Sequence, residues 1–419
     1  MALPCGFLSL AFNRLYLCTA DRSIFVCRHG APKRAFRPKT PRSFPSLFLM
    51  HVVGLNLAFL TPGVPGGMAT YSWSLLRELV ALKRYELMVF VQAGTALPSD
   101  LASKVRVVEV PQFSGRFQRV IWEQTILPRI ARRHRVHLMF SPGNTGPLLG
   151  DFRKVVTIHD LMYAMVPGSV ERYQARFRQV MDRLTARTAD AVIAVSETTA
   201  SDIRAKGLRV GTRLHVVHEA AGPGFGPDDP EDAIGACAHG PFIMMVASVL
   251  PHKSPQTVVQ AAARLWQHAG IRTVILGTDP YGTLAAALAR SGDVGITRLH
   301  GVSTPVLAAH YRRAVCLVMP SEYEGFGLPI LEAQLCGCPV VTTRRGALPE
   351  VAGDAALYIE PADADALVAA VSRLVEDEAL RHHLILRGQA NVGRFSWNKA
   401  AAQTAAIFDA CLARPHKSR

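Results

Sequence analysis

The feature that most constrains the fold of this chain is a series of short apolar runs that alternate with helix-periodic segments. In the first half the runs fall at residues 52–59, 87–91, 105–110, 136–140, 155–158 and 191–195, and in the second half they fall at residues 242–246, 273–276, 316–319, 340–343 and 356–359. Uninterrupted apolar strands with helices between them are typical of parallel sheets covered on both faces. The sequence therefore predicts an α/β fold.

A stretch rich in Gly, Pro, Asp and Ala, residues 221–240, separates the two series and is interpreted as a linker. The 419 residues exceed what one hydrophobic core normally serves. We therefore predict two Rossmann-like domains, residues 50–220 and 241–395, that face each other across a ligand cleft at the carboxyl ends of their strands. Residues 396–419 are expected to form a helix that packs back on the first domain.

Residues 1–49 differ from the rest of the chain. They hold eight Lys or Arg residues against the single acidic residue Asp21, and they lack the residue order of a signal peptide. We expect the functional chain to begin near Met50 and the preceding segment to be disordered or a non-native extension. Of the formal net charge of +15, this leaves +8 elsewhere, which suits an anionic partner such as a nucleotide diphosphate, a phospholipid surface or nucleic acid.

Composition excludes several other classes of protein. With 49% hydrophobic and 19% charged residues the chain is not disordered throughout. The eight cysteines show no metal-ligand spacing, which predicts buried, reduced thiols and a cytoplasmic protein. No apolar run reaches the roughly 18 residues of a membrane span. An Asp-x-Asp pair, Asp363 and Asp365, falls where a late helix should begin, so neither a metal site nor a cofactor is predicted.

The strongest chemical signal is the segment 320–333, Pro-Ser-Glu-Tyr-Glu-Gly-Phe-Gly-Leu-Pro-Ile-Leu-Glu-Ala. It follows a strand and ends in a helix, with Gly325 and Gly327 in the loop, where bare backbone N–H groups and the helix start can meet a ligand's oxygens. Glu324 in the loop and Glu332 one turn into the helix are expected to face one small volume and to accept hydrogen bonds from sugar or ribose hydroxyls. The alternative is a tight turn with solvated carboxylates.

The same segment resembles the E-x7-E signature of retaining glycosyltransferase family 4, and the similarity extends over about residues 50–412. The resemblance implies the GT-B fold of two Rossmann-like domains and a nucleotide-sugar donor. It implies that Glu324 contacts the hydroxyls of the donor sugar and that Glu332 holds the nucleotide ribose. The other donor-binding residues expected in this segment are Gly325, Phe326, Gly327 and Leu328.

Three further stretches resemble the family in the expected order. Gly66 and Gly67 match its N-terminal glycine loop, whose backbone approaches the donor phosphate. His159 matches a histidine near the donor's anomeric carbon, and Asp160 follows it. An isolated histidine after a strand is also common as a structural residue, and the glycine pair is also compatible with an ordinary turn.

The third stretch, residues 246–254, implies contact with the donor diphosphate through Lys253. His252 stands where the family usually has arginine, and a neutral imidazole offers one donor in place of a bidentate fork. Ala247 likewise replaces a glycine. We expect either that Lys253 suffices, that Arg344 or Arg345 assists, or that donor affinity is low.

A mechanism follows from the resemblance. Glu324, His159 and Lys253 are its expected catalytic residues, with Lys253, backbone amides and the helix start stabilising the leaving diphosphate while the protein shields an oxocarbenium-like sugar from water. The resemblance implies retention of anomeric configuration and metal independence. No enzymic nucleophile is evident, and the acceptor is expected to attack from the side of the leaving group.

Residues 116–135 contain six arginines interleaved with Trp122 and aliphatic residues, and Glu123 is their only acidic residue. One interpretation is a solvated basic surface. The other is a peripheral contact with anionic lipid, which would bring a lipid-linked acceptor to the cleft.

The function predicted from these features is transfer of a sugar from a nucleotide-diphosphate sugar to a glycan or lipid-linked acceptor in polysaccharide, lipopolysaccharide or glycolipid biosynthesis. Mannosyl transfer is one candidate, and the inner face of the cytoplasmic membrane is a candidate location. A nucleotide-sugar epimerase or phosphorylase on the same fold is the nearer alternative. A nucleic-acid-binding protein is the more distant one, because only the charge favours it and no nucleic-acid module is recognisable.

Overall fold

The computed structural model describes residues 19–20, 23–24, 50–64, 66–228, 240–280, 282–291 and 294–415. The chain divides into two units, Met1–Leu49 and Met50–Arg419. In the first unit only strands β1 (Thr19–Ala20) and β2 (Ser23–Ile24) are described, so the expectation of disorder there lies outside the described residues. The same holds for residues 229–239 of the expected linker. The second unit carries the architecture that follows.

The first sheet of this unit has seven parallel strands in the order β5-β4-β3-β6-β7-β8-β9. Their bounds are β3 Val52–Asn56, β4 Glu86–Gln92, β5 Arg106–Val110, β6 Leu138–Ser141, β7 Arg153–Ile158, β8 Ala191–Ala194 and β9 Leu214–Val216. Val53 of the central strand lies beside Leu87 and Leu138 of its two neighbours. Strand order reverses between β3 and β6, and open α/β sheets bind ligands at the carboxyl ends of such a pair.

The second sheet repeats this order with six parallel strands, β12-β11-β10-β13-β14-β15. Their bounds are β10 Phe242–Val246, β11 Arg272–Leu276, β12 Ile296–Leu299, β13 Leu317–Met319, β14 Val340–Thr343 and β15 Leu357–Ile359. The predicted α/β architecture of two Rossmann-like sheets is therefore confirmed. Two strands were not predicted, β9 and β12; both are short edge strands that carry polar residues.

Helices cover the sheets. Those connecting the first sheet are α1 Gly67–Ala81, α2 Ser99–Ala102, α3 Arg116–Thr125, α4 Leu127–Arg133, α5 Met162–Met165, α6 Arg172–Thr188 and α7 Glu197–Ala205. Those after it are α8 Pro255–Ala269, α9 Thr283–Ser291, α10 Thr304–Arg313, α11 Leu328–Leu335, α12 Leu348–Ala352, α13 Ala364–Glu376, α14 Glu378–Val392 and α15 Trp397–Leu412. Several helix starts follow from local side chains; Ser196, for example, caps α7 by accepting from the Thr199 N–H at 2.9 Å.

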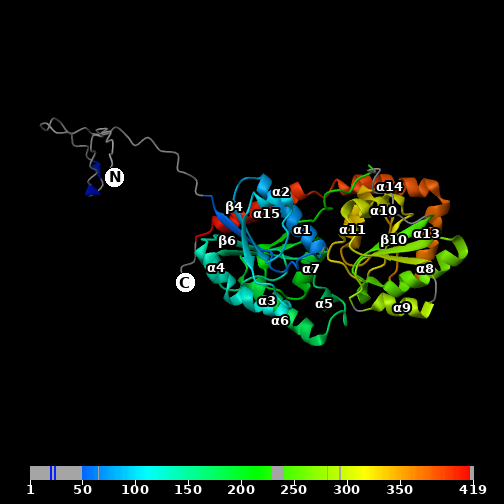
Figure 1. The fold of residues 1–419 in the computed structure, drawn as a ribbon, viewed down its shortest axis with the longest axis horizontal. Helices are drawn as coiled ribbons and strands as arrows, with labels where there is room; N and C mark the ends of the chain where they lie inside the picture. Colours follow the sequence, from blue (N-terminus) through cyan, green and yellow to red (C-terminus); the bar gives the residue numbers. More distant parts are fainter. Residues whose placement is uncertain are drawn as a thin grey trace, which may run out of the picture. The chain divides into compact units, whose positions relative to one another are not determined.

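The second sheet is buried on both faces, as its unbroken apolar strands require. Phe242 and Met244 of β10 pack in the core that contains α10 and α11, whereas Ile243 and Met245 pack in the core that contains α8 and α13. Figure 1 shows α10 and α11 on one side of β10 and α8 and α9 on the other. With both faces covered, the rim at the carboxyl ends of the strands is left for a ligand.

The last helix, α15, packs against the first sheet and its helix α1. The Tyr85 hydroxyl donates to the Ala405 carbonyl at 2.9 Å and to the Asp409 carboxylate at 2.6 Å, and the Phe140 and Phe408 rings lie 5.2 Å apart. The chain thus runs back from the second sheet to the first, which ties the two together.

Four cysteines lie among the described residues, and all are buried and unpaired, as predicted: Cys316, Cys336, Cys338 and Cys411. The other four cysteines lie outside the described residues. Among the described helices, none combines the length and apolarity that a bilayer span requires.

Candidate active site

A cavity of about 520 Å³ lies where loops at the carboxyl ends of the two sheets meet, and it is called the donor cavity here. The residues expected at the donor site line it with one exception. Those that line it are Gly66, Gly67, His159, Asp160, His252, Lys253, Glu324, Gly325, Phe326, Gly327 and Leu328. Residues separated by up to about 260 positions in the sequence therefore share one volume large enough for a small ligand.

Glu324 is held in place by the loop that carries it. Its carboxylate accepts from the Ser321 hydroxyl at 2.7 Å, and its carbonyl accepts from the Ala347 N–H at 2.9 Å. Gly346 makes this approach feasible: it has φ of 55°, and a side-chain carbon there would lie only 2.4 Å from the Glu324 carbonyl oxygen. The position of Glu324 therefore depends on a glycine in the next loop of the same sheet.

Lys253 follows β10 in a single 3₁₀ turn, Pro251–Lys253, and its ammonium pairs with the Glu324 carboxylate. Both side chains are largely buried at the cavity wall, so the pair presents one cation and one acceptor side by side. A diphosphate would be met by the cation and a sugar hydroxyl by the acceptor.

His252 lines the same wall, but as a neutral ring it cannot supply the positive charge of the arginine that the family usually has at this position. Burial and the neighbouring Lys253 charge lower the pKa of His252 to about 4, so the imidazole is neutral at pH 7. The expectation that Arg344 or Arg345 could assist is wrong for this structure, because neither lines the donor cavity. Arg344 stacks over the Tyr358 ring, and Arg345 pairs with an exposed glutamate at 3.0 Å.

Glu332 is the exception among the predicted donor residues. It was expected to face the same volume as Glu324, but it is not among the residues that line the cavity. It lies on the buried side of α11, is 8% exposed, and accepts from the Tyr311 hydroxyl at 3.0 Å. Burial raises the pKa of Glu332 to about 7 despite that hydrogen bond. The reason is helical geometry: a residue one turn into α11 is turned toward α10, which the sequence pattern did not reveal.

His159 is fixed at both ring nitrogens. Nδ1 lies 2.8 Å from the Glu219 carboxylate, and Nε2 lies 2.7 Å from the Pro142 carbonyl. A carbonyl can only accept, and an ionised carboxylate can only accept, so both contacts are satisfied together when both nitrogens carry protons. Burial lowers the pKa of His159, but the hydrogen bond and charge of Glu219 outweigh it, and the net shift is upward. Sequence reasoning missed Glu219, which lies 60 positions away.

This dyad predicts a pH dependence with a definite sign. Because the folded-state pKa of His159 is raised above its usual 6.5, its contribution to stability is complete below pH 6.5 and is lost as pH rises through the raised pKa. Imidazole nitrogen NMR should show His159 titrating above 6.5 in the wild type and below 6.5 in Glu219→Gln. A wild-type value below 6.5 would contradict the assignment of a doubly protonated ring.

Direct hydrogen bonds join the loop carrying Glu324 to the first sheet. The Gly325 carbonyl accepts from the Ser196 hydroxyl at 2.7 Å and from the Thr199 hydroxyl at 3.1 Å, both at the start of α7. A side-chain carbon on Gly325 would lie 1.9 Å from the His159 carbonyl oxygen. Only glycine permits this closeness of the two walls of the cavity.

A carboxylate of α12 also binds the start of α7. Glu350 accepts from the Glu197 N–H at 2.8 Å, from the Thr198 N–H at 3.1 Å and from His218 Nε2 at 2.7 Å. Burial raises the pKa of Glu350, but the bonds from His218 and the two amides outweigh it, so the net shift is downward. No local sequence pattern identifies Glu350 as the partner of this helix start.

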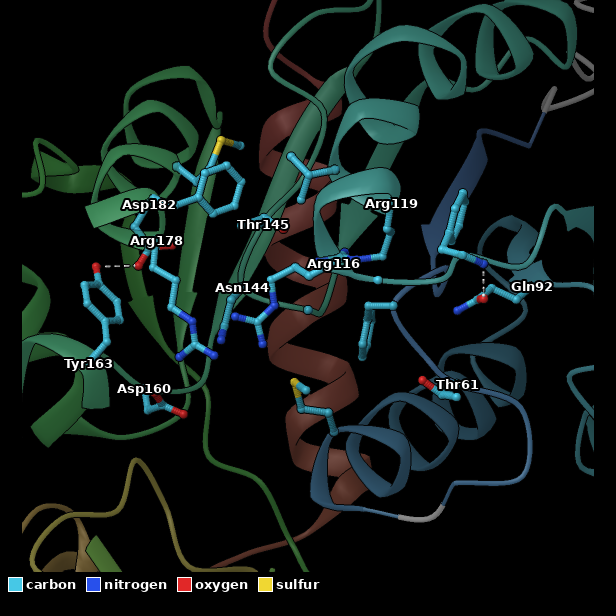
Figure 2. Close-up of a pocket in the computed structure, with 18 of the residues that line it drawn as sticks. Thr61, Gln92, Arg116, Arg119, Asn144, Thr145, Asp160, Tyr163, Arg178 and Asp182 are labelled. Carbon is cyan, nitrogen blue, oxygen red and sulfur yellow. Dashed lines mark hydrogen bonds between the residues drawn. The ribbon is translucent and has the colours of Figure 1, made fainter. Parts of the chain in front are cut away.

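A second cavity of about 430 Å³, called the side cavity here, opens in the first domain (Figure 2). Phe59, Thr61, Met68 and Asp160 line both cavities, so the two adjoin. Gln92 shapes the wall by donating to the Ala58 and Leu60 carbonyls, at 3.0 and 2.9 Å. Gly143, Asn144 and Thr145 also line this cavity, which the sequence did not predict.

Two sequence families match the chain. The family described as Glycosyltransferase Family 4 matches residues 65–220, and that described as Glycosyl transferases group 1 matches residues 233–391. Each match covers one of the two Rossmann-like domains.

Individual relatives agree. The O-antigen chain mannosyltransferase B of Escherichia coli is 29% identical over 262 residues, which are 60% of this chain and 69% of that protein. The D-inositol 3-phosphate glycosyltransferase of Xylanimonas cellulosilytica is 29% identical over 397 residues, which are 83% of this chain and 92% of that protein. Nothing in these matches favours the epimerase, phosphorylase or nucleic-acid-binding alternatives.

Solved structures share the fold. The sucrose-phosphate synthase of Thermosynechococcus elongatus superposes with a TM-score of 0.72 at 20% identity, covering 87% of this chain and 99% of that one. Anabaena HepE, solved in complex with UDP-glucose, superposes with a TM-score of 0.65 at 18% identity, covering 86% of this chain and all of that one. The two Rossmann-like domains and the cavity at their strand ends have the architecture of the GT-B fold. The matches to both of its domains show more: the chain belongs to glycosyltransferase family 4.

Proposed function

We propose that this glycosyltransferase moves a hexose from a nucleotide-diphosphate sugar to a glycan or lipid-linked acceptor, with retention of configuration and without a metal ion. The observation that carries the proposal is the Lys253–Glu324 pair at the wall of the donor cavity, which the glycine loop at Gly66 and Gly67 also lines. HepE, of the same fold, is described in complex with UDP-glucose, and O-antigen chain mannosyltransferase B by its name acts on an O-antigen chain. Mannosyl transfer in glycan biosynthesis is accordingly our first candidate.

In this proposal each group acts on one part of the donor. Lys253 and the amides of the glycine loop bind the diphosphate and stabilise it as it leaves, and Glu324 accepts hydrogen bonds from the sugar's hydroxyls. We assign Glu332 no contact with the donor, because it does not line the donor cavity and accepts from the Tyr311 hydroxyl. His159 is a positioning residue, because both its nitrogens already have protein partners. Asp160, the next residue, lines both cavities.

The proposal of metal independence rests on side-chain chemistry. Asp363 caps α13 by accepting from the Ala366 N–H at 2.8 Å, and Asp365 pairs with Arg264 of α8. Both carboxylates of the Asp-x-Asp pair therefore have structural partners within the protein. Within the described ranges no group of three or more His, Cys, Asp and Glu side chains is arranged to hold a metal ion. Lys253 lines the donor cavity and supplies a positive charge that can stabilise the leaving diphosphate.

A panel of nucleotide sugars tests the proposal. One or more of them should raise the melting temperature, and that donor should be consumed when an acceptor is added. NMR of the product should show the donor's anomeric configuration, and EDTA should leave the rate unchanged. If no nucleotide sugar stabilised the protein, the donor assignment would be wrong. A product of inverted configuration would contradict retention, and loss of activity in EDTA would contradict metal independence.

We also propose peripheral contact with an anionic membrane through residues 116–135 and the adjacent helix α6. Large apolar side chains are exposed here among arginines: Phe117 is 67% exposed and Tyr173 is 70% exposed, and the Phe117 and Phe177 rings lie 6.1 Å apart. Such a surface would hold the protein at the inner face of the cytoplasmic membrane, beside a lipid-linked acceptor.

Vesicle sedimentation checks this contact. The wild type should bind vesicles containing anionic lipid more strongly than neutral vesicles, and Phe117→Ser should reduce binding severalfold, while Val375→Ser, which removes an exposed apolar side chain from α13, should not. Equal binding to anionic and neutral vesicles would remove the proposal.

A further inference from the structure

The donor cavity carries little positive charge for the ligand proposed to bind there. Among the described residues that line it there is no arginine, and its acidic side chains are those of Asp160, Glu219 and Glu324. Glu219 pairs with His159 at 2.8 Å, and Glu324 pairs with the ammonium of Lys253. Asp160 forms no ion pair with a described residue. The cavity wall therefore has one negative charge in excess before a diphosphate enters.

His252 is a lining side chain whose charge is open to change. It is 4% exposed, and its Nδ1 atom is buried without a hydrogen-bond partner. Within the part of the chain that the structure describes, no residue forms a hydrogen bond with the ring. Its neutral state therefore depends on burial and on the charge of Lys253 rather than on a bond that fixes the proton. Such a state changes when a charged ligand arrives.

Three charged side chains act on this ring. Lys253, the next residue, lowers its pKa, whereas Glu324 from the loop before α11 and Asp160 from the loop after β7 raise it. The arginines Arg116 and Arg178 line the side cavity and not the donor cavity. A diphosphate adds two negative charges on the side of the carboxylates, and their attraction for a cation outweighs the loss of water around the ring.

We propose that His252 binds the donor diphosphate as an imidazolium, and that it takes up one proton from solvent when the donor enters the cavity. The inference rests on the proposed function and adds to it how the diphosphate is neutralised. The proton goes to the ring nitrogen that lacks one, so the ring gains a second N–H donor together with its charge. When the bond between sugar and diphosphate breaks, the leaving group gains a further negative charge, which the charged ring stabilises more than it stabilises the intact donor.

Histidine in place of arginine makes donor affinity depend on pH. An arginine is charged at any physiological pH, whereas the charge on His252 must be acquired during binding. Because the donor binds the charged ring more tightly, it raises the pKa of that ring. Affinity for the donor should therefore be higher at low pH and should fall by up to about tenfold per pH unit above the pKa of the bound state.

Calorimetric titration with a nucleotide sugar, in EDTA and in buffers of different ionisation enthalpy, measures the proton uptake. At pH 6 the esterified phosphates of the ligand exchange no proton, and His159, whose pKa is raised above 6.5, already carries its charge. The wild type should take up about one proton per donor bound. His252→Gln should take up none and bind roughly tenfold or more weakly, since it loses a charge-assisted contact. His252→Arg should bind without uptake and keep its affinity at pH 8.

His268→Gln is the matched control, because His268 is exposed on α8 and does not line the donor cavity; its proton uptake should equal that of the wild type. Melting temperatures establish that the variants are folded. Nucleotide-sugar binding without proton uptake, or with equal uptake in the wild type and His252→Gln, would overturn the inference and leave the donor assignment standing. A diphosphate with one methyl ester on each phosphate separates the opposite case: its binding with uptake at His252, when no nucleotide sugar binds, would support the inference and refute the proposed function. If neither ligand bound, both would be wrong.

Discussion

Glu324→Ala should lower kcat/KM for the nucleotide sugar by roughly tenfold to over a hundredfold, because it removes charge-assisted hydrogen bonds worth about 1.5 to 3 kcal/mol. The variant also leaves the Lys253 ammonium beside the donor cavity without its carboxylate partner. Binding of the nucleotide diphosphate alone should therefore be kept or strengthened while transfer is lost. Steady-state kinetics with the identified donor, together with titration of the nucleotide diphosphate, measure the two effects.

Ser321→Ala provides the control for this result. It removes one neutral donor to the Glu324 carboxylate and leaves the carboxylate in place, so the expected loss is about 1 kcal/mol, or several-fold in rate. If Glu324→Ala turned over its donor at the wild-type rate, Glu324 could not be the group that contacts the sugar. A loss confined to nucleotide binding would instead place Glu324 at the nucleotide end.

Gly325→Ala should reduce activity more than a hundredfold while the protein stays folded. The added methyl group would lie 1.9 Å from the His159 carbonyl oxygen and 2.9 Å from the Asp160 Cβ, so one wall of the donor cavity must move. Overpacking of this kind costs about 1 to 3 kcal/mol. The clash lies where the Gly325 loop meets His159 and not inside either sheet, so moving one wall relieves the strain, and the catalytic geometry is lost before the fold is.

Gly226→Ala is the matched control, because a methyl group there meets no atom within 4 Å. It should keep both activity and melting temperature. Activity of Gly325→Ala close to that of the wild type would show that the described contact between the Gly325 loop and His159 is not part of the working state. Unfolding of the variant would show that the two domains are not separately stable.

Much of the fold was predictable because each central strand is buried on both faces, and such a strand appears in the sequence as an unbroken run of apolar residues. Phe242 to Val246 is such a strand and was predicted with its observed bounds. The edge strands β9 and β12 have one open side, carry His215 and Arg298, and give no comparable signal. The start of α10 at Thr304 has a local signal, because Pro305 stands in its first turn.

The candidate site was predictable only where its residues are neighbours in sequence. Glu324 and Gly325 belong to one loop, whose ends are set by β13 and α11. Glu219 and Glu350 find their partners 60 and 153 positions away, through packing that no short pattern encodes. The direction of Glu332 was misjudged for a related reason: which side of α11 is buried depends on α10 and not on α11 itself. Arg116 of α3 and Arg178 of α6 both line the side cavity, and they come together only after these helices have packed.

The wall shared by the two cavities has a consequence for fidelity. When the side cavity is empty, solvent can stand beside Asp160, next to the place where the activated sugar would lie. Water standing there would be able to attack the activated sugar and hydrolyse the donor. A molecule that filled the side cavity would expel that water and so protect the activated sugar from hydrolysis.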